Sequence, residues 1–249
     1  MSTRELHIVE DEATLARELA RRIVDEARRA LEARGTFAFA LAGGSTPKAT
    51  YALLAAEYAD ALDWARVRFF FGDERCVAPT DAQSNYRTAH DALFTPLGIA
   101  DANIFRMRGD DEPTAAAHAY ADVLRNTLAR APDGTPIFDL VLLGMGPDGH
   151  TASLFPGTDP FTDDALLVRA PYVAIFATHR LTLTPRVMNA ARAVVVATAG
   201  YAKAPALQAI FDGPHDPMRY PIAVLDPHDG TLDFIVDRAA ASQLAPRSR

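Results

Sequence analysis

The stretch that most constrains this chain spans residues 138–157 and reads FDLVLLGMGPDGHTASLFPG. It begins with a nearly unbroken apolar run, which is typical of a strand covered on both faces, as in a parallel sheet. Glycine and proline at residues 144–147 end that strand. Asp148 and His150 therefore follow the carboxyl end of a predicted central strand, where open α/β sheets bind their ligands.

The rest of the chain repeats a strand, a loop and a helix. This pattern predicts a doubly wound α/β fold with a mostly parallel sheet flanked by helices. Apolar residues at four-residue spacing predict an amphipathic helix over residues 11–34, which Gly35 ends. We expect residues 1–249 to form a single domain, because no internal repeat or long linker divides the sequence.

The other elements are predicted from shorter patterns. Strands are expected at residues 37–41, 67–71, 138–143, 173–177, 193–198, 222–225 and 232–236. Helices are expected at residues 48–58, from Ser84 onward, and at 112–130, 184–191 and 202–211.

Composition narrows the class of protein. The single cysteine allows no disulfide framework, and the charged N-terminal stretch lacks the apolar core of a signal peptide. No apolar run approaches the ~20 residues that span a bilayer. We expect a cytoplasmic protein that binds no membrane. The net charge of −7 and the lack of a basic tract argue against nucleic-acid binding, so an anionic ligand would need a local cationic pocket.

The segment Gly43-Gly44-Ser45-Thr46-Pro47 joins a predicted strand to a predicted helix. Its glycines let the backbone approach a ligand closely. Thr46 is expected to cap the helix, with Pro47 at the first helical position. The free N–H groups and the helix dipole then favour an anion, most simply a phosphate. The alternative is an ordinary capped turn.

Charged residues follow three other predicted strands. In Gly72-Asp73-Glu74-Arg75, Arg75 can hold a carbonyl or phosphate oxygen, although a solvated loop with a salt bridge explains the same residues. Arg180 and Lys203 follow the strands predicted at 173–177 and 193–198. Each alone reads as a surface charge. Together they supply the two cations that a phosphate at this edge of the sheet requires.

Asp148 and His150 are the best acid/base candidates in the sequence. A histidine just inside a helix N-terminus has its charged form disfavoured, so His150 would stay neutral and accept a proton. Asp148 would orient the imidazole or a substrate hydroxyl. The alternative is a histidine that packs a turn. The remaining histidines show no metal-ligand spacing, and we expect no metal site.

At this point the motifs are recognisable as a set. The segments LAGGSTPKATYALL, FFFGDERCVAPTDAQSNYRTAHDALF, FDLVLLGMGPDGHTASLFPG and RLTLTPRVMNAA occur in order over nearly the whole chain. The sequence resembles the 6-phosphogluconolactonase family of the pentose phosphate pathway, which shares its α/β fold with glucosamine-6-phosphate deaminases. The resemblance implies hydrolysis of a sugar-phosphate lactone, no cofactor, and a monomer or weak homo-oligomer.

The resemblance also implies roles for the matching residues. The catalytic residues would be His150 as general base, Asp148 as its partner and Arg75 as the oxyanion donor. The substrate and its phosphate would be bound by Gly43, Gly44, Ser45, Thr46, Asp73, Arg87, Arg180 and Lys203.

Two other functions compete with lactone hydrolysis. The related deaminases carry a glutamate five residues after the histidine and a tyrosine after the Asp-Glu pair. Here those positions hold Phe155 and Arg75, which favours the lactonase. A non-catalytic sugar-phosphate sensor would need the glycine loop and the late cations, but not Asp148, His150 and Arg75 together.

Overall fold

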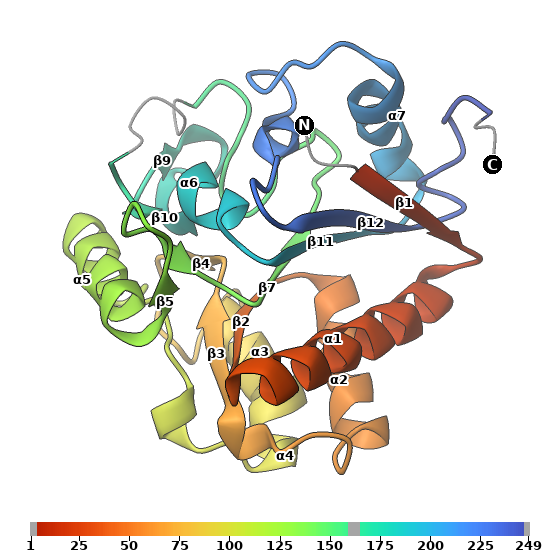
Figure 1. Cartoon of the computed structure of the whole chain (residues 1–249). Helices are drawn as coiled ribbons and strands as arrows, with labels where there is room; N and C mark the ends of the chain where they lie inside the picture. The colour runs from red at the N-terminus through yellow and green to blue at the C-terminus, as the bar shows by residue number, and fades with distance from the viewer. Residues whose placement is uncertain (1–3, 159–164, 247–249) are drawn as a thin grey trace.

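Six parallel strands form the central sheet of the computed structural model, which describes residues 4–158 and 165–246. Their order is β1-β12-β11-β7-β2-β3 (Figure 1). The strands are β1 (Arg4–Val9), β2 (Phe37–Leu41), β3 (Val67–Phe71), β7 (Leu140–Gly144), β11 (Ala193–Thr198) and β12 (Thr231–Asp237). The predicted α/β fold with a mostly parallel sheet is confirmed.

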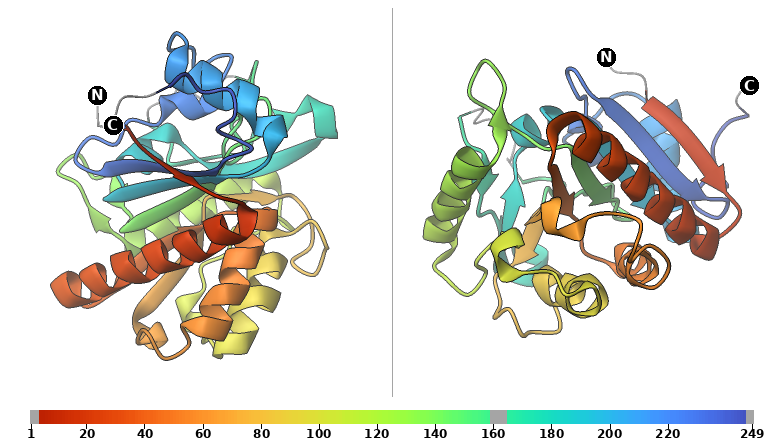
Figure 2. Two further views of the ribbon diagram at one scale, coloured as in Figure 1. Left: turned by 90° about the vertical axis from the view of Figure 1, so that its right-hand side faces the viewer. Right: turned by 60° about the horizontal axis from the view of Figure 1, so that its bottom comes forward.

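Helices cover both faces of this sheet. The α-helices of the described residues are α1 (Glu12–Arg34), α2 (Ser45–Glu57), α3 (Asn85–Ala89), α4 (Thr95–Leu97), α5 (Pro113–Thr127), α6 (Pro185–Asn189) and α7 (Ala204–Asp212). Figure 2 shows α1 and α2 on one face of the sheet and α7 on the other. Every residue of β11 is buried, as the continuous apolar pattern predicts for a strand covered on both sides.

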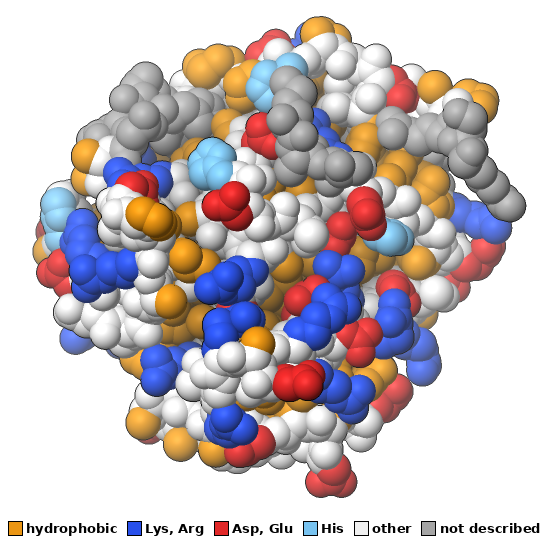
Figure 3. Space-filling model, viewed as in Figure 1, with side chains coloured by type: hydrophobic (Ala, Val, Ile, Leu, Met, Phe, Trp, Pro, Cys, Tyr) orange, Lys and Arg blue, Asp and Glu red, His pale blue; other side chains and the backbone are white. Residues whose placement is uncertain are grey.

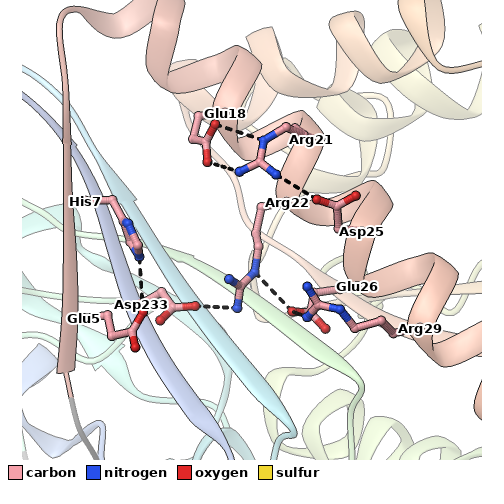
Figure 4. Close-up of polar contacts among 9 residues, drawn as sticks. All are labelled: Glu5, His7, Glu18, Arg21, Arg22, Asp25, Glu26, Arg29 and Asp233. Atoms are coloured by element: carbon pink, nitrogen blue, oxygen red, sulfur yellow. Dashed lines mark hydrogen bonds and ion pairs between the residues drawn. The ribbon is translucent and has the colours of Figure 1, made fainter.

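Helix α1 has the bounds that its sequence predicts. Asp11 caps it by accepting a hydrogen bond from the Thr14 N–H, and Gly35 ends it in the left-handed conformation. Arg22 lies between the helix and the sheet, where it pairs with Glu26 on α1 and with the buried Asp233 on β12 (Figure 4). The helix is thereby fixed to the sheet by charge as well as by its apolar stripe.

The surface of the α1 side carries charges of both signs. In Figure 3, acidic and basic side chains lie next to each other over this face rather than in separate patches. Arg21, for example, pairs with both Glu18 and Asp25 on α1 (Figure 4). None of the helices among the described residues is both long enough and apolar enough to cross a bilayer.

A second, smaller sheet lies beyond β3. It is antiparallel and has β10 (Thr178–Leu183) at its centre. Its other strands are β4 (Asp73–Arg75), β8 (Val168–Arg169) and β9 (Tyr172–Val173), and α5 packs against it. Two short strands, β5 (Ala129–Arg130) and β6 (Pro136–Ile137), pair with each other. Because β4 follows β3 directly, the small sheet begins at the carboxyl edge of the large one.

Two predicted strands need correction, and one strand was not predicted. The strand predicted at 173–177 ends at Val173, continues as a 3₁₀ turn over Ala174–Phe176, and leaves Ile175 72% exposed. The strand predicted at 222–225 is a 3₁₀ helix, Pro221–Val224, whose residues are mostly buried although they pair with no strand. Strand β1 was not predicted, because an edge strand with charged residues lacks a continuous apolar run.

Candidate active site

The candidate active site lies where the order of the sheet reverses. From β2 the chain continues to β3 on one side, and β7 pairs with β2 on the other. The loops that follow β2 and β7 therefore diverge, which leaves a crevice at the carboxyl ends of the strands. A pocket of about 210 Å³ occupies this position. Among the residues that line it are Gly43, Gly44, Asp73, Arg75, Gly146, His150 and Lys203.

Asp148 and His150 form a hydrogen-bonded pair at this pocket. Asp148 Oδ1 lies 2.6 Å from His150 Nδ1 and also accepts the His150 backbone N–H at 3.1 Å. Among the described residues, His150 Nε2 has no hydrogen-bond partner, so it is the nitrogen free to exchange a proton with a ligand. One part of the prediction is wrong: no helix begins at His150, because residues 151–154 form an isolated bridge. The helix-dipole argument for a neutral imidazole does not apply.

The Asp148 carboxyl group is held in its charged form. Partial burial acts to raise the pKa of Asp148, but the hydrogen bonds from the His150 backbone and ring outweigh it and leave the pKa below the usual value of 3.8. A carboxylate that accepts N–H hydrogen bonds is favoured over the neutral acid. Asp148 is therefore an acceptor at neutral pH, which fixes the proton of the neutral imidazole on Nδ1.

The glycine loop after β2 leads into α2. Gly44 is the N-cap of this helix, with φ at +109°, and it has no side chain to bond the first N–H groups. These groups have no acceptor within the helix, so they and the helix dipole favour an anion. Two details of the prediction are wrong: the helix starts at Ser45, so Thr46 is not its cap and Pro47 is not its first residue.

The side chains of Ser45 and Thr46 do not line the pocket. Ser45 is exposed, and the buried Thr46 hydroxyl donates to Glu12 of α1 at 3.3 Å. A ligand at this loop would therefore meet their backbone N–H groups.

Asn85 connects the glycine loop to Asp73. Its amide donates to the Asp73 side chain at 3.0 Å, and it packs so closely on Gly43 that a Cβ there would lie 1.9 Å from Asn85 Oδ1. The other oxygen of Asp73 accepts from the Ser153 hydroxyl at 2.7 Å. Asp73, a predicted binding residue, is thus held at the pocket wall by two residues that the sequence reasoning did not single out.

Glu74 has a structural role that the sequence reasoning missed. The side chain is buried and accepts the backbone N–H groups of Asn85 and Tyr86 and the Ser84 hydroxyl. Burial raises the pKa of Glu74 against the effect of these N–H donors. The residue organises the start of α3 rather than facing a ligand.

Arg75 and Arg180 lie side by side on the small sheet. They are directly opposite each other in the β4–β10 register, which places their side chains on the same face. Each has a buried Nε without a hydrogen-bond partner among the described residues. Burial and the neighbouring Arg75 lower the pKa of Arg180, and they outweigh the opposite effect of Asp73 and Glu74.

The structure places the other predicted cations differently. Arg180 lies within β10 and not at the carboxyl end of a parallel strand, because the strand predicted at 173–177 does not form. Lys203 follows β11 as predicted, lines the pocket, and has its pKa lowered by burial, against the attraction of Asp148. Arg87 is exposed, bonds to the Thr80 carbonyl and pairs with Asp91, and it does not line the pocket.

A separate group of side chains offers metal-ligand atoms. One atom each from Glu5, His7 and Asp233 lies within 4.8 Å of the others (Figure 4). Arg22 already pairs with Asp233 at this point, so a metal cation would lie against a guanidinium group. The candidate active site itself does not use these residues.

Comparisons with known proteins identify the family of this chain. The sequence model of the family described as glucosamine-6-phosphate isomerases/6-phosphogluconolactonase matches residues 10–234. A 6-phosphogluconolactonase of Treponema pallidum is 40% identical over 84% of this chain and 85% of its own length. One of Nostoc is 37% identical over 87% and 88%.

Solved structures show the same relationship. The 6-phosphogluconolactonase of Trypanosoma brucei superposes with a TM-score of 0.88 at 28% identity, covering 98% of this chain and all of that chain. A monomeric glucosamine-6-phosphate deaminase, 20% identical, shares the fold, with a TM-score of 0.80 over 96% of this chain and 99% of its own. The chain belongs to the glucosamine-6-phosphate isomerase/6-phosphogluconolactonase family.

Proposed function

We propose that this protein hydrolyses 6-phospho-D-glucono-1,5-lactone to 6-phospho-D-gluconate, with His150 as the general base. The observation that carries the proposal is His150, which is bonded to Asp148 at 2.6 Å and lines a pocket together with Gly43 and Gly44 of the glycine loop, Arg75 and Lys203. The names of the relatives in Treponema pallidum and Nostoc support the choice of substrate.

The phosphate would be anchored at the carboxyl edge of the large sheet. A phosphate carries nearly two negative charges at neutral pH. The first N–H groups of α2 and the Lys203 ammonium would hold it. Arg180 does not line the pocket, but it lies opposite the pocket residue Arg75 and would supply a further cation from β10. This local positive charge would attract the substrate in spite of the net charge of −7.

Hydrolysis would then need one proton carrier. With Nδ1 bonded to Asp148, Nε2 of the neutral imidazole takes a proton from a water molecule as the water oxygen attacks the lactone carbonyl carbon. Arg75 stabilises the negative charge on the former carbonyl oxygen, a contribution of about 3 kcal/mol for one donor. The tetrahedral centre collapses, the bond to the ring oxygen breaks, and His150 returns the proton to that oxygen.

The residue that packs on His150 favours hydrolysis over deamination. The Phe155 ring lies 4.5 Å from the imidazole centroid and carries no group that can transfer a proton. An isomerising deaminase needs a further acid/base group to open the sugar ring and move a proton between carbons. Hydrolysis of an activated ester needs only the activated water.

A direct assay tests the activity. Purified protein is added to freshly prepared 6-phosphogluconolactone, and acid release is followed above the spontaneous background. We expect saturable turnover, and no ammonia from glucosamine 6-phosphate. Ammonia release without lactone hydrolysis would replace the proposal with deamination, and binding of 6-phosphogluconate without either reaction would indicate a sensor.

His150→Ala tests the role of the imidazole. We expect kcat to fall by about 10²–10⁴-fold with little change in the affinity for 6-phosphogluconate, because the phosphate anchor is retained. His228→Ala is the matched control, since His228 is exposed and lines a different cavity. Turnover of His150→Ala at the wild-type rate would remove this residue from the mechanism.

A further inference from the structure

Two phenylalanines connect the acid/base histidine to the buried arginine of the small sheet. Phe155 contacts the His150 ring at a centroid distance of 4.5 Å and meets the Phe176 ring edge-on at 5.7 Å. The guanidinium carbon of Arg180 lies 4.9 Å from the centroid of the Phe176 ring. The four side chains therefore form one continuous row, His150-Phe155-Phe176-Arg180.

Arg180 depends on this row for its position. The residue is only 8% exposed, yet within residues 4–158 and 165–246 its guanidinium makes no ion pair and its Nε has no hydrogen-bond acceptor. The guanidinium group of Arg75, opposite on β4, repels it. Asp73 and Glu74 attract the guanidinium without forming an ion pair with it, and the ring face of Phe176 is in direct contact with it, where the face of an aromatic ring attracts a cation.

Phe176 is itself placed in an unusual way. It is 49% exposed at the end of the 3₁₀ turn Ala174–Phe176, although a phenylalanine is ordinarily buried. The next residue, Ala177, has φ at +49°, in the left-handed region that residues with a Cβ rarely adopt. A backbone that turns a large apolar ring partly toward water is explained if the ring has to lie over Arg180.

We propose that Phe176 is a positioning residue that holds Arg180 for the phosphate of the substrate, and that Phe155 joins it to His150. The inference rests on the proposed function for the identity of the ligand. It predicts that the ring face of Phe176, and not merely its bulk, determines the affinity for a phosphorylated ligand through Arg180. Phe155, which is buried against His150, would contribute to kcat rather than to anion affinity.

The test measures the affinity of 6-phosphogluconate by calorimetry, so it does not depend on turnover. Phe176→Leu keeps an apolar side chain without a ring face, and we expect its Kd to rise about 3–10-fold. Phe176→Tyr keeps the ring and should stay within twofold of wild type. Ile175→Ala is the control, because Ile175 is 72% exposed on the same turn and takes no part in the row.

A double-mutant cycle shows whether the effect passes through Arg180. In the Arg180→Ala background, Phe176→Leu should cause no further loss, whereas an indirect effect on the fold would persist. Equal losses in Phe176→Leu and Phe176→Tyr, or an undiminished effect of Phe176→Leu without Arg180, would overturn the inference. Unchanged thermal unfolding of Phe176→Leu confirms that the variant is folded. If the wild-type protein binds 6-phosphogluconate but does not hydrolyse the lactone, the proposed activity is wrong. The role of Phe176 in binding can still be tested in that case.

Discussion

Lys203 is a pocket residue whose charge depends on pH. Burial lowers the pKa of Lys203 below the usual 10.5, and the nearby Asp148 opposes this effect. A lysine with a lowered pKa loses its proton at a less alkaline pH than an exposed lysine. The phosphate anchor should therefore weaken before ordinary lysines titrate.

We expect the Kd of 6-phosphogluconate to rise as the pH increases from about 8 toward 10, because neutral Lys203 no longer attracts the phosphate dianion. Lys203→Arg is the control, since a guanidinium stays charged over this range. Calorimetry at a series of pH values measures both proteins. A parallel loss of affinity in Lys203→Arg would assign the titration to another group.

Sequence reasoning found the residues of the site that follow parallel strands. Asp148, His150 and Lys203 could be placed because the carboxyl ends of β7 and β11 meet at one edge of the sheet. Asn85 and Ser153 could not, because their contacts with Asp73 join segments 12 and 80 residues apart in sequence. No local spacing predicts such contacts, which form only in the folded chain.

At the scale of elements, the turn after β7 packs closely against the imidazole of His150. Gly146 donates its N–H to the His150 carbonyl at 2.8 Å and accepts from the Gly149 N–H. A Cβ at Gly146 would lie 2.0 Å from His150 Nδ1 and 2.6 Å from Asp148 Oδ1. The turn thus needs glycine here for space, so that the acid/base pair can fold back over the backbone.

Gly146→Ala should displace the imidazole and lower kcat by about 10²-fold, the loss expected from a misplacement of about 1 Å. Gly144→Ala is the comparison at the end of β7, also on the pocket wall, because a Cβ there meets nothing nearer than the Ala197 carbonyl at 3.9 Å. Steady-state kinetics compares the two variants. Wild-type kcat in Gly146→Ala would mean that the geometry of the turn does not limit catalysis.

The element that the sequence described least well is the approach to β10. Residues 173–177 are apolar, so they predict a buried strand, but only Val173 pairs there, and Ile175 and Phe176 face outward. An apolar run predicts that most of its side chains are buried. It does not show that the segment lies in the parallel sheet. The role of Phe176 beside Arg180 accounts for the exposed ring.

At the scale of the whole molecule, the two ends of β7 have different tasks. Asp148 follows the strand at the pocket. Asp139 precedes it at the opposite edge of the sheet, where it accepts the Ala38 N–H at 2.8 Å and pairs with Arg34 and Arg192. It thereby joins the end of α1 to β2 and β11. The strand between them spans about 17 Å, taking roughly 3.3 Å per residue, so the two carboxylates act on separate properties.

The last prediction compares these two aspartates. Asp139→Ala leaves a buried N–H without an acceptor and two arginines without their partner, so we expect the free energy of unfolding to fall by about 2–4 kcal/mol with kcat and KM within twofold of wild type. Asp148→Ala should do the reverse, because its side chain is 40% exposed and its hydrogen bonds go only to the ring and the backbone N–H of His150 among the described residues. There kcat should fall at least tenfold with stability nearly unchanged. Denaturant unfolding and steady-state kinetics measure both variants, and a loss of kcat in folded Asp139→Ala would show that the two edges of the sheet are coupled.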